Sequence, residues 1–416
     1  MQSIWPPRTP LPVPVAPKVC SVETHGPYTG GRGWPAINSG NATSAATFDP
    51  LKPPPVKPVS AYGTAVPGLF TSEFGVTSFS SFESISATLD PKDWGVHSKP
   101  MFWRSYSADN IVSSYFGLNK AVNFSTVGEP NVFARQLLLS QLAAALLVKS
   151  RVETFRSQNN FGTLTWQLGE IFPTGGWGSL EYAHVQETRG QVRGGRWKPL
   201  HYWFESTLFK DAFVACGKFG MCYVRNDSPF QEIQGGHILL ELLSVATGKR
   251  RGKQMTKQVS LPVGPGAVSW FCAAEWGKMP NCPLWSQVLA GEGCAGDGSD
   301  CILNITLVDS SGRNLVSNPS LLAAPLVMLP KLPPVSIKAT VVSPFPAPGH
   351  SNLPIRVIVT ATAPAMFVTL STLAQGRFSR NAFFMKGGSE TLEFYPLATE
   401  GDQYSILKES LKIQHL

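Results

Sequence analysis

The longest uninterrupted helical pattern in the chain, residues 131–157, lies between two short apolar segments with strand character. It is rich in Leu and Ala and has no Gly or Pro, so it predicts one long helix. An apolar run ending at Glu73 precedes it, and the alternating run Phe161–Leu168 follows it. A strand, a helix and a strand in this order predict two parallel strands joined by a crossover. Residues 61–214 are therefore predicted to be an α/β unit, the kind that builds open parallel sheets and (β/α)₈ barrels.

The remainder of the chain has a different texture. Residues 195–213 are predicted to be helical, with a proline near their start. Beyond residue 214, short β-branched or alternating runs are separated by turn residues, which predicts β-sandwiches of immunoglobulin-like type. A proline-rich linker divides this part into predicted domains at 215–332 and 333–416. Residues 1–60 are rich in Pro and Gly and are predicted to be irregular.

Composition excludes several classes of protein. Of 416 residues, 43% are hydrophobic and 15% charged, which is typical of a folded protein rather than a disordered one. The net charge of +8 is diffuse, and its densest stretch, Lys249–Lys253, is predicted to be an exposed hairpin tip, so we expect no nucleic-acid partner. The longest apolar run, Leu137–Val148, is too short to cross a bilayer, and no membrane span is predicted.

Cysteines and sequons give a weak indication of the compartment. The seven cysteines form no C-x-x-C pair, so no metal site is predicted. Four N-x-S/T sequons, at Asn41, Asn123, Asn226 and Asn304, permit glycosylation and favour the secretory route. The prolines of the opening residues, MQSIWPPRTPLPVPV, would break an apolar helix, so no signal peptide is predicted in this chain.

One carboxylate, Glu73, stands out as a candidate for chemistry. Burying a carboxylate at the end of an apolar strand costs free energy unless the carboxylate is paired or has a catalytic or binding role. Taken alone, Glu73 fits a nucleophile, a general base, a metal ligand or a buried ion-pair partner. Trp166 fits either a core or, beside Gln167 and near Trp177, the flat face of a pyranose ring. The sequence has no H-E-x-x-H, no G-x-S-x-G and no phosphate-binding glycine loop, so no cofactor is predicted.

Four separated motifs carry a family resemblance. They are SEFG (Ser72–Gly75), GTLTWQLGEIFPTGGWGSLEY (Gly162–Tyr182), GRWKPLHYW (Gly195–Trp203), and GRFSRNAFFM (Gly376–Met385) with LEFYP (Leu392–Pro396). In this order and at this spacing they resemble the nucleophile segment, the W-Q-L-N-D region, the G-R-W-K-x-L-H-Y segment and the terminal signatures of β-mannosidases of glycoside hydrolase family 2.

The resemblance implies a function. Glu73 would be the catalytic nucleophile, and Trp166, Gln167 and Trp177 would bind the substrate, a β-mannoside oligosaccharide. The expected reaction removes β-D-mannose from the non-reducing end of oligosaccharides or N-glycan fragments, as in glycoprotein breakdown, without a cofactor. The resemblance also implies that the chain holds the end of a (β/α)₈ TIM barrel followed by two immunoglobulin-like sandwiches, in a protein that is lysosomal, vacuolar or secreted.

A retaining mechanism needs a second carboxylate about 5–5.5 Å from the first. In the resembled family it is a Glu preceded by Asn, upstream of the nucleophile. The only acids before Glu73 are Glu23 and Asp49, and neither follows an Asn or ends an apolar strand. We therefore expect the acid/base to lie outside this chain and the isolated chain to be nearly inactive.

The motifs also depart from the family pattern. Gly169-Glu170 replaces Asn-Asp, residues 183–194 are extra, and Arg380 stands where an Asp is expected. Two alternatives therefore stay open: a non-catalytic carbohydrate- or protein-binding remnant, and a family 2 glycosidase for another β-linked sugar. The oligomeric state is not indicated by the sequence.

Overall fold

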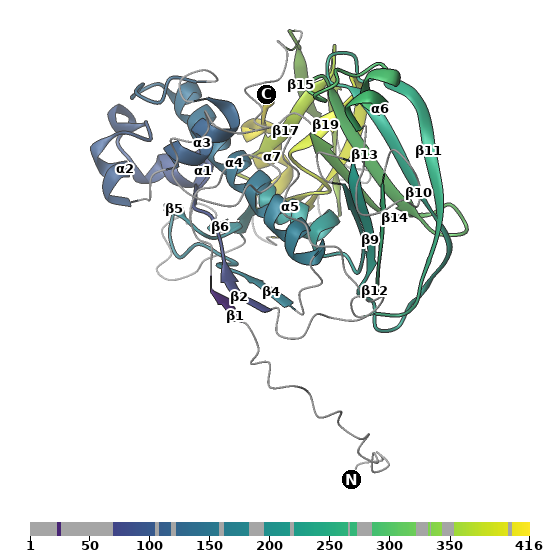
Figure 1. Ribbon diagram of the computed structural model, residues 1–416. Helices are drawn as coiled ribbons and strands as arrows, with labels where there is room; N and C mark the ends of the chain where they lie inside the picture. The colour runs from purple at the N-terminus through teal and green to yellow at the C-terminus, as the bar shows by residue number, and fades with distance from the viewer. Residues whose placement is uncertain are drawn as a thin grey trace.

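A small parallel sheet, a helical layer and two β-sandwiches make up the protein (Figure 1). In Figure 1 the helices α1 to α3 lie on the left, the teal and green strands β9 to β14 on the right, and β1, β2 and β4 at the lower end. The computed structural model describes residues 23–25, 70–104, 108–117, 122–157, 162–182, 195–216, 220–264, 267–272, 285–321, 332, 334–342, 353–397 and 402–416.

The parallel sheet has the order β1–β2–β4 (β1, Glu23–His25; β2, Phe70–Phe74; β4, Gly162–Thr165). Strand β2 pairs in parallel with both neighbours, so the predicted parallel pairing across the crossover is confirmed. The strand at 23–25 lies within a segment that was predicted to be irregular. Three residues carry too little periodicity to be recognised, and their pairing with β2 is a tertiary effect. The rest of residues 1–60 lies outside the described part of the chain.

Helix α4 (Pro130–Ser157) confirms the predicted long helix and is buried around nearly its whole circumference. By length and composition it is the one described helix apolar enough to cross a membrane, but most of it is enclosed by the protein, as in a core helix. Gln136 is a buried polar side chain of this helix whose amide group is fully bonded. The side chain of Gln136 accepts from Val96 N–H (3.1 Å) and donates to the carbonyls of Asn123 (2.8 Å) and Thr126 (3.1 Å).

The remaining elements of the helical layer are short. They are β3 (Ser78–Phe79), α1 (Phe82–Ile85), 3₁₀ turns at Ser86–Thr88 and Pro91–Asp93, α2 (Lys99–Arg104), α3 (Asp109–Phe116), β5 (Gly175–Gly176) and β6 (Leu180–Tyr182).

The helix predicted over 195–213 is only partly present. Residues Gly195–Trp197 form strand β7, followed by α5 (Pro199–Trp203) and a π-helical turn (Phe204–Leu208). Strand β7 pairs with β6, and Pro199 at the first helical turn marks where the helix can begin. Tertiary pairing has therefore overridden the helical pattern of the first three residues.

The first sandwich packs a three-stranded sheet, β12–β9–β8, on a four-stranded sheet, β11–β10–β13–β14. The predicted strand texture is confirmed, although β11 begins at Arg250, so the basic run lies mostly in a strand rather than in the hairpin tip. The elements are β8 (Ala212–Cys216), β9 (Met221–Asn226), β10 (Ile233–Ser244), β11 (Arg250–Leu261), β12 (Ala267–Cys272), α6 (Trp285–Gly291), β13 (Cys301–Val308) and β14 (Asn314–Leu321).

The second sandwich packs β15–β16–β20–β18 against β19–β17–β21. Strand β8 crosses the domain limit predicted at residue 214, and the other limits stay predictions. The elements are β15 (Ile337–Val341), β16 (Ile355–Ala361), β17 (Ala365–Ser371), β18 (Gly376–Phe378), β19 (Phe383–Met385), β20 (Gly388–Pro396), α7 (Gln403–Ser410) and β21 (Lys412–Gln414).

Candidate functional site

Glu73 and the other candidate site residues lie at one end of the parallel sheet. Phe74 of β2 is the register partner of Thr165 of β4, and the N–H of Trp166 donates to the carbonyl of Phe74 at 2.7 Å. Glu73 directly precedes this junction, and Trp166 and Gln167 directly follow it. The side chain of Glu73 is partly buried, whereas that of Trp166 is 45% exposed. The carboxyl ends of both strands therefore bring these residues to the same end of the sheet.

Gly75 permits the close approach of the next segment. A Cβ atom at this position would lie 2.0 Å from the carbonyl oxygen of Trp166 and 3.1 Å from Cε3 of Trp177. The N–H of Gln167 donates to the carbonyl of Trp177 at 3.2 Å, which brings the following loop back over the strand ends. Trp177 therefore reaches the same end of the sheet although it lies eleven residues after Trp166. The catalytic and binding roles of these residues stay predictions.

Helix α4 contacts the strand end through a hydrogen bond and a ring contact. Arg151 Nη1 donates to the carbonyl of Gly75 at 3.1 Å, and the rings of Phe74 and Phe155 meet edge to face at 5.1 Å. Burial lowers the pKa of the Arg151 guanidinium to about 10, so it stays charged at neutral pH. Sequence reasoning did not select Arg151. A cation placed within a long apolar helix is the signal that would have pointed to it.

A buried ion pair holds the loop that follows Trp166. Lys198 Nζ lies 2.6 Å from Glu170 Oε1, and both side chains are 2% exposed. The same ammonium donates to the carbonyl and the hydroxyl of Ser78, each at 3.2 Å, while Gly178 N–H donates to Glu170 Oε1 at 3.1 Å. The Glu that departs from the family pattern therefore has a defined structural partner. Lys198 was part of a recognised motif, but its contact with Glu170 was not predicted.

A second polar group links this loop to the carboxyl-terminal sandwich. Glu181 Oε2 accepts from Ser81 N–H at 2.6 Å, and burial raises the pKa of this carboxyl group. Its cross-strand neighbour Arg196 donates to Ser84 Oγ and to the carbonyl of Thr372, each at 2.8 Å. The loop therefore has fixed contacts to both the helical layer and the second sandwich.

Two other groups of titratable residues have structural contacts. His201 lies with Nδ1 3.0 Å from Ser179 Oγ, and burial lowers its pKa to about 4, so it is neutral at pH 7. Cys294, Asp300 and Cys301 lie within 4.8 Å of one another, but the two sulfurs form a disulfide and are not thiolate ligands. The extra segment 183–194 lies outside the described residues.

Comparison with known proteins bears on the family resemblance that the motifs indicate. Residues 337–416 match the model of a mannosidase family described as an Ig-fold domain. The chain is 29% identical over 144 residues to β-mannosidase of Bos taurus and 28% identical over 155 residues to β-mannosidase A of Aspergillus terreus. Each match covers 32% of this chain but only 15% and 16% of those proteins.

Solved structures share the fold over a larger part of the chain. A β-D-mannosidase from Dictyoglomus thermophilum matches with a TM-score of 0.57 and 18% identity, over 84% of this chain and 37% of that chain. An exo-chitosanase from Amycolatopsis orientalis matches with a TM-score of 0.54 and 15% identity, over 84% and 42%. The resemblance read from the motifs is confirmed by these matches, and the chain is related to the carboxyl-terminal part of the β-mannosidases.

Proposed function

We propose that this chain carries the nucleophile half of a retaining glycosidase site of β-mannosidase type, as in glycoside hydrolase family 2. Its substrate would be β-D-mannose at the non-reducing end of an oligosaccharide or N-glycan fragment. The supporting observation is the position of Glu73 at the carboxyl end of β2, beside the segment that carries Trp166 and Gln167. The relatives named β-mannosidase support the choice of sugar.

Each residue has a role in this proposal. The Glu73 carboxylate attacks the anomeric carbon and forms a glycosyl-enzyme, which water then hydrolyses. The rings of Trp166 and Trp177 offer flat apolar faces for the mannose, and the Gln167 amide can bond its hydroxyl groups. We further propose that β1, β2 and β4 are strands of a (β/α)₈ barrel, because chemistry in that fold sits at the carboxyl ends of the strands.

The second carboxylate is the limiting part of the site. Three buried carboxylates around the loop after Trp166 already have partners: Glu170 binds Lys198, Glu181 accepts from Ser81, and Glu83 accepts from Ser371 at 2.9 Å. None of these three is placed in the acid/base role. We therefore expect the isolated chain to cleave substrates poorly when their leaving group needs a proton.

A substrate whose leaving group needs no proton tests the nucleophile separately. Fluoride leaves without protonation, and a fluorine at C2 slows hydrolysis of the intermediate, so 2-deoxy-2-fluoro-β-D-mannosyl fluoride should label the nucleophile covalently. We expect one label per chain on Glu73, located by peptide mass spectrometry, and no label on Glu73→Gln. The same chain should release little mannose from β-1,4-mannobiose, because its sugar alcohol leaves only with a proton from an acid.

The other outcomes discriminate between the alternatives. A label on a different carboxylate would refute the assignment of Glu73. Saturable binding of mannobiose without any label would favour a non-catalytic carbohydrate-binding protein. Labelling by the glucosyl or glucosaminyl analogue but not by the mannosyl one would favour a glycosidase for another β-linked sugar. Fast hydrolysis of mannobiose that depends on Glu73 would show that the acid/base is present after all.

We also propose that the protein works in a lysosomal, vacuolar or extracellular compartment. The supporting observation is the pair of disulfides in the first sandwich, Cys216–Cys222 and Cys294–Cys301, because disulfides persist mainly in oxidising compartments. Alkylation of the protein from its natural source, before and after reduction, tests this. Thiols that react at Cys294 and Cys301 without reduction would contradict the proposal.

A further inference from the structure

Three of the four sequons lie in the described residues, and their amide groups differ in the hydrogen bonds they already make. Asn226, in β9, is 1% exposed, and its amide nitrogen donates to the carbonyls of Gln231 (2.7 Å) and Pro262 (2.9 Å). Both amide hydrogens are therefore used. An N-linked sugar would replace one of them and would have to enter a closed interior, so this fold does not accept a glycan at Asn226.

Asn123 presents the opposite case. Its side chain is exposed, and its amide oxygen accepts from Ser125 N–H at 2.9 Å within a turn. Among the described residues its amide nitrogen makes no hydrogen bond that a sugar would break. A glycan at Asn123 would project into solvent at no structural cost, which makes this sequon a positive reference for the others.

Asn304 is an intermediate case with a specific environment. It lies in the middle of β13, partly buried, with β10 and β14 on either side. Its amide nitrogen donates only at the long limit, 3.5 Å to Glu241 Oε2, while its amide oxygen accepts from Ser317 Oγ at 3.2 Å. A sugar on the nitrogen leaves one amide hydrogen and the oxygen, so both contacts can persist after modification.

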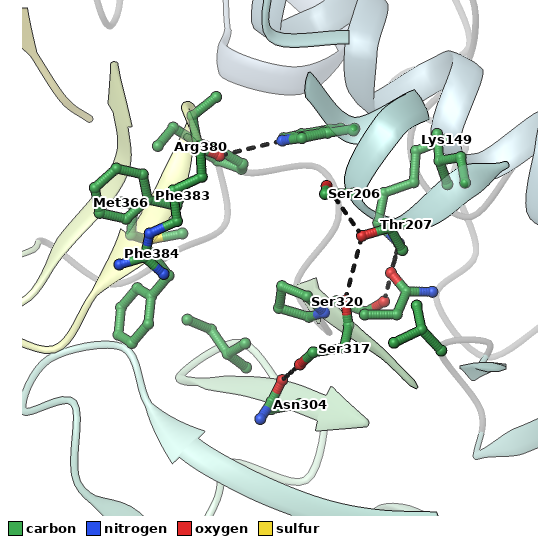
Figure 2. A pocket seen from close by; sticks show the side chains of 18 of the residues that line it. Lys149, Ser206, Thr207, Asn304, Ser317, Ser320, Met366, Arg380, Phe383 and Phe384 are labelled. Carbon is green, nitrogen blue, oxygen red and sulfur yellow. Dashed lines mark hydrogen bonds between the residues drawn. The ribbon is translucent and has the colours of Figure 1, made fainter. Parts of the chain in front are cut away.

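The side chain of Asn304 also lines a cavity of about 540 Å³ between the two sandwiches and the π-helical turn. Figure 2 shows Asn304 bonded to Ser317 on one wall, Thr207 beside them, and Phe383 and Phe384 on the opposite wall. Trp203 adds a further aromatic ring, which its N–H holds by donating to the carbonyl of Ala382 at 3.3 Å. A volume of this size, with aromatic walls and a few hydroxyl and amide groups, suits a small polar ring such as a pyranose.

We propose that Asn304 is N-glycosylated and that its first N-acetylglucosamine occupies this cavity. In the transfer, Asn304 Nδ2 forms a bond to the anomeric carbon of a lipid-diphosphate-linked oligosaccharide. The bond from that carbon to the diphosphate breaks, the diphosphate leaves with the electron pair, and the amide nitrogen loses one proton. The seated sugar would join β13 to the walls contributed by the π-helical turn and the second sandwich.

This inference is independent of the proposed catalysis and depends instead on passage through a compartment where glycans are added. The two disulfides of the same sandwich favour such a compartment. The third residue of the sequon, Thr306, has its hydroxyl 3.0 Å from Ser317 Oγ. Because the third residue of a sequon must be Ser or Thr, Thr306→Ala removes the sequon and leaves Asn304 in place, whereas Thr306→Ser keeps the sequon.

The test directs the full chain through the secretory pathway of a eukaryotic cell with an added cleavable leader. Folded protein is recovered from the medium and from the cells, and occupancy is read by peptide N-glycosidase digestion in ¹⁸O water followed by mass spectrometry. We expect occupied Asn123 and Asn304 and unoccupied Asn226. Thr306→Ser should keep the glycan at Asn304, whereas Thr306→Ala should lose it with Asn123 unaffected.

Seating of the sugar has its own readout. Peptide N-glycosidase should release the glycan of Asn123 from the native protein, and that of Asn304 only after the protein is denatured. An unoccupied Asn304 in folded protein that carries a glycan at Asn123 would overturn the proposal. Release of both glycans at equal rates from native protein would overturn the seating of the sugar in the cavity. An occupied Asn226 in folded protein would contradict the claim that its two amide hydrogen bonds exclude a glycan.

Discussion

The ion pair between Lys198 and Glu170 gives a sharp test of what holds the candidate site together. Replacing Lys198 by Met keeps the length of the side chain but removes the ammonium. It leaves the Glu170 carboxylate, 2% exposed, without its partner at 2.6 Å, and it also removes the two bonds to Ser78. Breaking a buried pair by deleting one partner typically costs about 3–5 kcal/mol.

Lys198→Met should also make the loop at residues 166–181 open more often. The N–H groups of Gly178, Ser179 and Leu180 bond to Glu170 Oε1 and to the carbonyl of Leu168, so they report opening of this loop. A loss of about 3–5 kcal/mol corresponds to about 150- to 4,000-fold faster hydrogen exchange if these amides open with the pair. Hydrogen exchange read by mass spectrometry on peptides from residues 166–181 measures this directly.

Two controls make the reading specific. Lys210→Met removes an exposed ammonium that lies 4.0 Å from Glu205, and it should change stability by less than about 1 kcal/mol. The double variant Lys198→Met with Glu170→Gln removes both charges, and it should recover part of the loss. The reasoning is refuted if Lys198→Met leaves exchange at residues 166–181 unchanged, or if the double variant is as unstable as the sum of the two single ones.

Three other changes test separate parts of the structure. Gly75→Ala should cost about 1–3 kcal/mol by overpacking and abolish the covalent labelling of Glu73, whereas Gly291→Ala, with nothing within 4 Å, should be neutral in thermal unfolding. His201 has a pKa of about 4 against an ordinary 6.5, so its contribution to the free energy of unfolding is complete above pH 6.5 and is lost as the pH falls toward 4. Urea unfolding of the wild type should show this loss of stability, and urea unfolding of His201→Gln should not. Replacing both Cys294 and Cys301 by Ala opens a loop with a sequence separation of 7 and should lower the free energy of unfolding by about 2.5 kcal/mol. An unchanged urea midpoint in this double variant would contradict the expectation.

Much of the architecture follows from local pattern in the sequence. Helix α4 was predictable because 27 residues without Gly or Pro, rich in Leu and Ala, favour one conformation throughout. The parallel pairing of β2 and β4 followed from the order of the elements, and β10, β13 and β16 followed from alternation between buried and exposed positions.

What was missed depends on contacts between distant parts of the chain. Strand β1 and strand β7 are three residues each, and their pairing partners rather than their own periodicity make them strands. The bond from Lys198 to Ser78 joins residues 120 positions apart, and no local pattern records it. Glu73, Trp166 and Trp177 could be chosen from motifs, but the close approach that requires Gly75 could be seen only in the fold.

Helix α4 also links the first sandwich to a site that lies outside it. Lys149 and Glu153 form a buried ion pair on this helix and bond Asn318 of β14, at 2.7 Å from Nζ and 2.9 Å to Oε1. Arg151, between them in sequence, donates to the carbonyl of Gly75 beside Glu73. One helix therefore contacts the first sandwich and the strand end within the same five residues. The backbone two residues after Glu73 is therefore held by a helix that also binds the first sandwich.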